Sequence, residues 1–160
     1  MKLAHLLGSE QIILDMEAGE HWASIQELVG RLVSSGALPA GMQQEVLTSL
    51  KAREELVSTG IGNGVAIPHA FSDELEKVVA IFGRSKQGID FQSIDGAPVK
   101  LIILFIVPRK DYHMHLRTLA AIAKMFTNPE VRQRLQEVET SDEILAILGS
   151  KPSRVAAPSV

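Results

Sequence analysis

A nearly uninterrupted apolar run, VKLIILFIV at residues 99–107, constrains the fold of this 160-residue chain more than any other feature. A run so rich in aliphatic and β-branched residues indicates a strand whose two faces are both buried. It is far shorter than the ~20 apolar residues that cross a bilayer. The run therefore predicts the central strand of a sheet, and such a sheet needs helices on both of its faces.

The remaining segments supply those helices and a few shorter strands. Residues 20–34 carry Ile25, Leu28 and Leu32 at helical spacing. A second helix follows Pro39, a residue that the first helical turn tolerates, and continues to about Leu56. Three further helices are expected at residues 112–126, 128–135 and 141–148, short strands at residues 11–16, 65–67 and 78–82, and a turn-rich segment at residues 88–98. The pattern predicts an α/β (or α+β) fold with a central sheet flanked by helices.

Length and composition set the domain organisation and exclude several classes of protein. We predict one domain at residues 1–150 and a flexible tail at residues 151–160, KPSRVAAPSV, which has two prolines and no periodicity. A formal net charge of −3 argues against a nucleic-acid partner. The absence of cysteine excludes disulfides and thiolate chemistry. Without a signal peptide or an apolar span, the chain is expected to be cytoplasmic and not inserted in a membrane.

The stretch STGIGNGVAIPHA, residues 58–70, is the most unusual part of the sequence. It is neither a Walker A loop nor a dinucleotide fingerprint, because the spacing is wrong and no Gly-Lys-Ser/Thr follows. Its glycines permit two interpretations. One is an ordinary turn before a strand; the other is a cradle in which the backbone N–H groups around Gly62 and Gly64, with Thr59 and Asn63 as further donors, hold an anion.

A histidine ends this stretch, and two other candidate residues flank it. Pro68 restricts the backbone before His69, whose imidazole titrates near neutral pH and is a nucleophile toward phosphorus. Arg53 precedes the glycines and would be a bidentate phosphate partner, although the residue taken alone is better explained by a solvated helix face with Lys51 and Glu54. His115 falls in the first turn of the helix at residues 112–126 if Asp111 caps it, on the edge of the buried stripe.

Metal and acid–base chemistry find little support in the sequence. His113 and His115 lie two residues apart and on roughly opposite faces of the expected helix, so they are poorly placed to chelate one metal ion. No third ligand stands at clear spacing, and no metal or organic cofactor is expected. Asp90 and Asp95 lie in the turn-rich segment, where aspartate is common for conformational reasons.

Taken together, these motifs resemble the enzyme IIA components of the bacterial phosphoenolpyruvate-dependent sugar phosphotransferase system, fructose/mannitol type. The likeness rests on STGIGNGVAIPHA, on the arginine before it, on FQSIDGAPVKLIILFIVP at residues 91–108 and on HLRTLAAIAKMF at residues 115–126. The likeness extends over residues 3–148, and within the family the sequence is most similar to the nitrogen-regulatory branch. Ala70 stands where members of the family frequently have glycine. The resemblance implies no role for His113.

The resemblance implies a function and roles for single residues. His69 would accept a phosphoryl group from the histidine-containing phosphocarrier protein (HPr, or its nitrogen-type counterpart NPr), His115 would hydrogen-bond the phosphorylated ring, and Arg53 would lie near the phosphoryl group. It implies the IIA fold, an α/β sandwich with a mixed sheet. Three readings remain open: a regulator that binds target proteins according to its phosphorylation state, a transport component that passes the group to a IIB domain, or a binding module without phosphotransfer.

Overall fold

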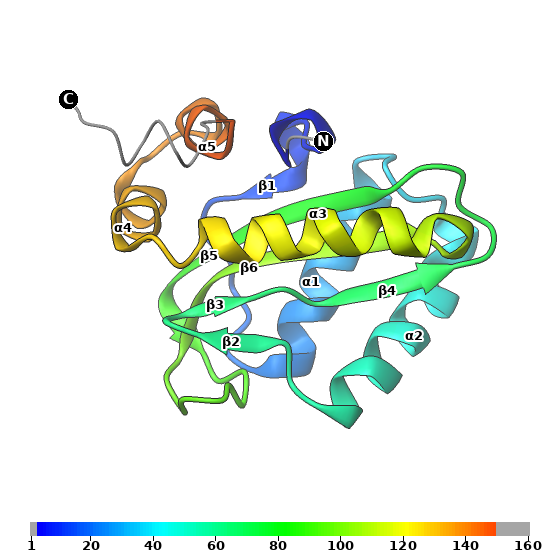
Figure 1. The fold of residues 1–160 in the computed structure, drawn as a ribbon, viewed down its shortest axis with the longest axis horizontal. Helices are drawn as coiled ribbons and strands as arrows, with labels where there is room; N and C mark the ends of the chain where they lie inside the picture. Colours follow the sequence, from blue (N-terminus) through cyan, green and yellow to red (C-terminus); the bar gives the residue numbers. More distant parts are fainter. Residues whose placement is uncertain (1–2, 150–160) are drawn as a thin grey trace.

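A six-stranded mixed sheet forms the centre of the protein, with helices on both faces, as the apolar run predicts. The computed structural model describes residues 3–149, so the predicted tail at residues 151–160 lies outside the described residues. The strand order is β1-β5-β6-β3-β2, and β4 also pairs with β6 (Figure 1). The strands are β1 Ile12–Ile13, β2 Gly60–Gly62, β3 Val65–Ala66, β4 His69–Ser72, β5 Val79–Ile89 and β6 Val99–Pro108.

The apolar run is the centre of this sheet. Strand β6 pairs antiparallel with β5 on one side, and on the other side it pairs in parallel with both β3 and β4. Its side chains alternate between two cores: Ile103 and Phe105 enter one cluster, and Ile102 and Leu104 enter the other. Burial of both faces explains why β6 reads as a continuous apolar segment.

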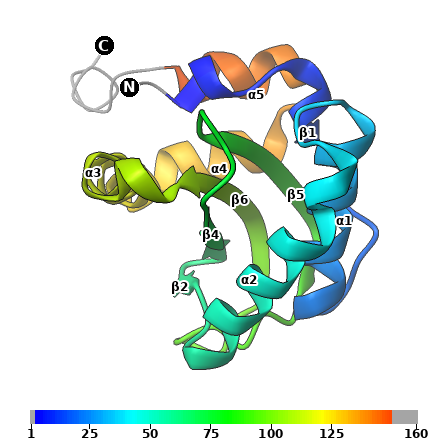
Figure 2. The ribbon, with the colours of Figure 1, turned by 90° about the vertical axis from the view of Figure 1, so that its right-hand side faces the viewer.

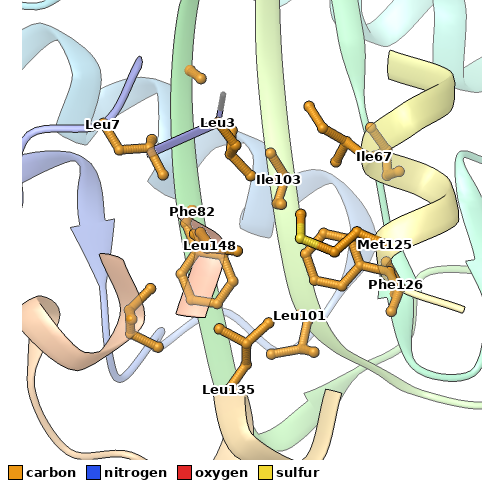
Figure 3. Packing of buried hydrophobic residues seen from close by; sticks show 14 of the residues in the cluster. Leu3, Leu7, Ile67, Phe82, Leu101, Ile103, Met125, Phe126, Leu135 and Leu148 are labelled. Carbon is orange, nitrogen blue, oxygen red and sulfur yellow. The ribbon is translucent and has the colours of Figure 1, made fainter. Parts of the chain in front are cut away.

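Two groups of helices cover the two cores, as Figure 2 shows. Helices α1 His21–Ser34 and α2 Gln43–Leu56 cover one face, with Leu28 and Leu50 fully buried against it. On the other face lie α3 Tyr112–Met125, α4 Pro129–Glu137 and α5 Ser141–Leu148. Figure 3 shows the second core, in which Phe82 lies beside Leu148, and Met125 lies beside Phe126. Short 3-10 turns complete the fold at Leu3–Leu6, Ser9–Gln11, Ala40–Met42 and Arg109–Asp111.

Most predicted elements are confirmed, and the exceptions have physical reasons. Pro39 precedes the 3-10 turn Ala40–Met42 and not the first turn of α2 itself. Strand β5 runs seven residues past the predicted end at Phe82, so the start of the turn-rich segment was predicted wrongly. Strands β2 and β4 were not predicted, because both depend on pairing with β3 and β6 more than on their own composition. The second helix ends at Leu56 as predicted, and the Leu56 side chain is 83% exposed.

A buried arginine ties the sheet to the helices of the second face. Arg84 on β5 is only 3% exposed. Its guanidinium donates hydrogen bonds to the carbonyl oxygens of Leu14 after β1 and of Leu135 and Val138 at the end of α4. A cation at a helix C-terminus also interacts favourably with the negative end of the helix dipole. Arg84 thereby fixes the position of α4 against the edge of the sheet.

Candidate functional site

His69 opens strand β4, next to the central strand. Pro68 separates β3 from β4 and has no N–H to donate, but its carbonyl oxygen accepts a hydrogen bond of 3.0 Å from the Phe105 N–H. His69 stands opposite Phe105 in the parallel ladder. Burial alternates along β4, so Ala70 and Ser72 are buried while His69 and Phe71 are half-buried. Phe71 belongs to the core under α3, and His69 therefore points toward the α3 face as well.

The hydrogen bond of the His69 ring decides which nitrogen is reactive. The Nδ1 atom lies 3.0 Å from the carbonyl oxygen of Ile67. A carbonyl oxygen only accepts, so Nδ1 must carry the proton of the neutral imidazole. The lone pair is then on Nε2, which makes Nε2 the nucleophilic atom of this side chain.

Aromatic and basic side chains surround the exposed side of His69. The ring of Phe71 packs edge-to-face on His69, with centroids 6.2 Å apart, and on Tyr112, at 4.8 Å. The Arg109 guanidinium lies 5.8 Å from the centroid of Phe71. Phe71, Tyr112 and Arg109, but not His69 itself, line a hollow of about 420 Å³ at the start of α3 together with Lys110 and His113. The aromatic and basic side chains of this hollow form a surface near His69 that could contact another protein.

His115 lies on α3 above the same part of the sheet. It is 6% exposed and lines a narrow apolar cleft with Phe105 and Val107, so it is more deeply buried than the stripe edge that the sequence predicted. Asp111 occupies the N-cap position as expected, but its side chain makes no capping hydrogen bond. Both histidines thus adjoin Phe105, His69 from the neighbouring strand and His115 from the helix above it.

Arg53 lies in the last turn of α2, a helix that packs against β4. Its Nη1 atom donates a hydrogen bond of 2.8 Å to the carbonyl oxygen of Val57, just beyond the helix end. This bond satisfies a carbonyl at the C-terminus of α2, a structural role that arginine often has. The guanidinium carries four further N–H donors for an anion.

The glycine turn at Gly62–Gly64 contacts the carboxylate of Asp95, a side chain of the protein itself. Gly62, Asn63 and Gly64 all have positive φ angles, of 96°, 59° and 79°. The carboxylate of Asp95 accepts the Asn63 N–H at 3.1 Å, and hydrogen bonds from the backbone N–H groups of Ala97 and Asn63 lower the pKa of this carboxyl. The positive φ angles give this turn the backbone shape that the glycines predicted, and one of its N–H groups, that of Asn63, is bound to Asp95.

The strand register also separates this turn from His69. Val65 pairs with Leu101 on β6 and His69 pairs with Phe105, four residues further along. At 3.3 Å per residue these positions are roughly 13 Å apart. The expected contact between the N–H groups of Gly62, Asn63 and Gly64 and an anion on His69 is not supported by this arrangement.

Thr59 makes its hydrogen bonds with the protein itself. Its hydroxyl donates to Oε2 of Glu54 at 2.5 Å, and its N–H donates to Oε1 at 3.1 Å, so it is not a free anion donor. Glu54 in turn contacts Nε2 of His21 at 2.7 Å, and this ion pair is largely buried. The sequence reasoning missed His21 and Glu54. The available signal was spacing, since Glu54 follows Val46 and Leu50 at intervals of four residues on the buried face of α2.

The pKa values of this pair move in opposite directions. Burial by itself lowers the pKa of His21, but hydrogen bonds with Glu54 and Gln92 raise it above the ordinary value. Burial alone raises the pKa of Glu54, and the hydrogen bonds from His21 and Thr59 more than offset it, so the net pKa is lowered. Both shifts favour a charged pair.

Two further classes of site were tested on the part of the chain that the structure describes. Within residues 3–149, no group of three or more His, Cys, Asp or Glu side chains is arranged to hold a metal ion. No helix among these residues is both long and apolar enough to cross a membrane.

Comparison with known proteins gives a consistent assignment. Residues 5–151 match the family model for the phosphoenolpyruvate-dependent sugar phosphotransferase system, EIIA 2. The chain is 31% identical to a nitrogen regulatory protein of Bradyrhizobium diazoefficiens, covering 98% of this chain and 100% of that protein. It is 34% identical to the fructose-specific EIIABC component of Bacillus subtilis over 92% of this chain, but it spans only 23% of that longer protein.

The solved structures agree with the sequence relatives. The crystal structure of nitrogen regulatory protein IIA-Ntr from Neisseria meningitidis superposes with a TM-score of 0.84 at 34% identity, covering 91% of this chain and 98% of that one. The IIA mannitol protein of Escherichia coli has the same fold, with a TM-score of 0.74 at 23% identity. The match to the family model covers nearly the whole chain, and the chain belongs to the EIIA type-2 family of the phosphoenolpyruvate-dependent sugar phosphotransferase system.

Proposed function

We propose that this protein is a phosphocarrier that accepts a phosphoryl group on Nε2 of His69 from a phosphohistidine of HPr or NPr. The observation that carries the proposal is the bond between Nδ1 of His69 and the Ile67 carbonyl, which leaves the Nε2 lone pair free. In the transfer, a bond forms between Nε2 and phosphorus while the bond between phosphorus and the donor imidazole breaks. The electron pair of that bond returns to the donor ring, and the Nδ1 proton of His69 stays in its hydrogen bond.

The neighbouring groups have supporting roles in this proposal. Phosphoryl transfer depends on positioning and on neutralising the equatorial oxygens. Arg53, with four donors beyond its bond to Val57, is proposed as the cation for these oxygens. His115, which adjoins Phe105 as His69 does, is proposed to hydrogen-bond the phosphoryl group. We propose that the glycine turn acts indirectly, by holding β3 in register with β6.

A protein donor needs an exposed docking surface beside His69. Tyr112 and Leu116, one helical turn apart on α3, are 37% and 39% exposed, and Tyr112 packs on Phe71 beside His69. An exposed apolar patch next to a reactive side chain is typical of an interaction site. We propose that the carrier docks on this start of α3.

The regulatory reading is preferred over the transport reading. The relatives matched over nearly their full length include nitrogen regulatory proteins from Bradyrhizobium and Pseudomonas aeruginosa. Phosphorylation would add about −1.5 to −2 charges at His69 and so alter the binding of target proteins. The similarity to fructose-specific components keeps transfer to a IIB domain as the second candidate. Rapid transfer from the phosphorylated protein to a fructose IIB domain would favour transport, and no transfer would favour regulation.

Labelling with radioactive phosphoenolpyruvate and the two general carrier proteins tests the phosphocarrier proposal. The wild type is expected to take up one phosphoryl group per chain, and His69→Ala none. His5→Ala is the control, because His5 is an exposed histidine in the first 3-10 turn, outside the proposed docking surface and transfer path. Normal labelling of His69→Ala would refute the assignment.

A further inference from the structure

A buried ion pair on the far side of the sheet is connected to His69 by a continuous set of hydrogen bonds. His21 is the first residue of α1, and Glu54 lies in the last turn of α2. Their side chains are 16% and 5% exposed, and Nε2 of His21 is 2.7 Å from Oε1 of Glu54. A buried pair of this kind contributes little net stability but holds its two elements in one arrangement.

The contacts of the His21 ring indicate its charge. Nδ1 lies 3.2 Å from Oε1 of Gln92, and Nε2 faces the Glu54 carboxylate. Both nitrogens thus point at oxygen acceptors, and only the doubly protonated ring satisfies both. The ring also stacks on Phe91, with centroids 4.0 Å apart. His21 is therefore held as a cation between the loop that carries Phe91 and Gln92 and the end of α2.

Glu54 passes this constraint to the segment that carries His69. Its two oxygens accept the N–H and the hydroxyl of Thr59. The Thr59 carbonyl accepts the Ile67 N–H at 3.1 Å, and the Ile67 carbonyl accepts Nδ1–H of His69 at 3.0 Å. The His21–Glu54 pair therefore orients, through Thr59, the Ile67 carbonyl that fixes the tautomer of His69.

We infer that His21 and Glu54 are positioning residues for phosphoryl transfer, which act on the His69 ring through Thr59 and Ile67. The inference rests on the phosphocarrier function proposed above. Loss of the His21 cation would leave the Glu54 carboxylate buried without its partner, and Thr59 would lose its fixed acceptor. Because α1 packs on the opposite face of the sheet from α3, the donor docking surface would be unaffected. The inference therefore predicts a loss in kcat and no change in KM for the phosphorylated carrier.

Three variants test this inference. His21→Leu removes the cation and both donors, and we expect its kcat to fall about tenfold with KM within about twofold of wild type. His21→Lys keeps a cationic donor toward Glu54 and is expected to recover most of that loss. His5→Leu is the matched control, since His5 is an exposed histidine in the first 3-10 turn, and it should leave both constants unchanged.

Nitrogen-15 NMR of the His69 ring provides a readout that does not depend on turnover. The wild type should show the Nδ1–H tautomer alone, and His21→Leu should show a mixture of tautomers. If the leucine variant is unfolded by circular dichroism, His21→Gln takes its place, because glutamine keeps one N–H donor without the charge.

The outcomes separate the two levels of the proposal. A folded variant with wild-type kcat and the Nδ1–H tautomer alone would overturn the positioning role, while uptake by the wild type in the same assay would leave the phosphocarrier function standing. A kcat loss that lysine does not recover would overturn the need for a cation at position 21. Absence of uptake by the wild type would instead overturn the phosphocarrier function.

Discussion

Replacement of Arg84 by methionine should destabilise the protein strongly. Methionine has a comparable apolar stem, so the change removes the guanidinium and leaves the packing volume nearly filled. Four carbonyl oxygens, of Leu14, Leu135, Gln136 and Val138, lose a charged donor, the bond to Gln136 being the longest at 3.4 Å. Hydrogen bonds to charged groups contribute about 1.5–3 kcal/mol each, and relief of the buried charge offsets part of their sum. We therefore expect a loss of about 3–4 kcal/mol in the free energy of unfolding, a large part of the 5–15 kcal/mol typical of a domain.

Urea denaturation followed by circular dichroism measures this loss directly. Arg31→Met is the matched control, because Arg31 makes one exposed hydrogen bond of 3.4 Å to the Glu10 carbonyl, and it should cost less than about 0.5 kcal/mol. Hydrogen exchange should show the largest change at the end of α4, where three of the four carbonyls lie. A loss below about 1 kcal/mol in Arg84→Met would contradict the argument that these bonds anchor α4.

Three further predictions follow from other contacts. The pKa of His21 is raised in the folded state. The stability that the charged ring contributes is therefore fully present below the unfolded pKa near 6.5 and is lost as pH rises through the folded pKa. The free energy of unfolding from urea titrations should fall over that pH range in the wild type and fall less in His21→Lys. Gly83→Ala should cost about 1–3 kcal/mol in the same titrations, because the new Cβ would lie 2.5 Å from Sδ of Met16 and 2.8 Å from Cδ2 of Leu28, and unchanged stability would refute this overpacking. Asp95→Ala should lower the melting temperature while the labelling rate of His69 stays within about twofold of wild type, since the glycine turn lies roughly 13 Å away; a lost rate would show that the turn acts on His69 directly.

Elements with a strong local signal were predictable from the sequence. The run at residues 99–107 is β6 almost to the residue, because burial on both faces leaves an unbroken apolar pattern. Thr140 caps α5 by accepting the Glu143 N–H, as its place before two acidic residues indicates. Strands β2 and β4 carry no such signal, since partners distant in the sequence stabilise them.

The candidate site shows the same division. The position of His69 after proline, and of His115 in the first turn of a helix, followed from local rules. The contact between the glycine turn and Asp95 was not predicted, because Asp95, which accepts the Asn63 N–H, is 32 residues away in the sequence. His21 and Glu54 are 33 residues apart, and no periodicity links them. Hydrogen bonds between distant segments are the part of the site that the sequence alone did not reveal.

Nitrogen-15 and phosphorus-31 NMR of the phosphorylated protein test the central claim most directly. After incubation with phosphoenolpyruvate and the two carrier proteins, a scalar coupling between phosphorus and a ring nitrogen identifies the modified atom. The geometry predicts one phosphoryl group, bonded to Nε2 of His69, with Nδ1 still protonated toward the Ile67 carbonyl. A phosphoryl group on Nδ1 of His69, or on any other histidine, would contradict the account.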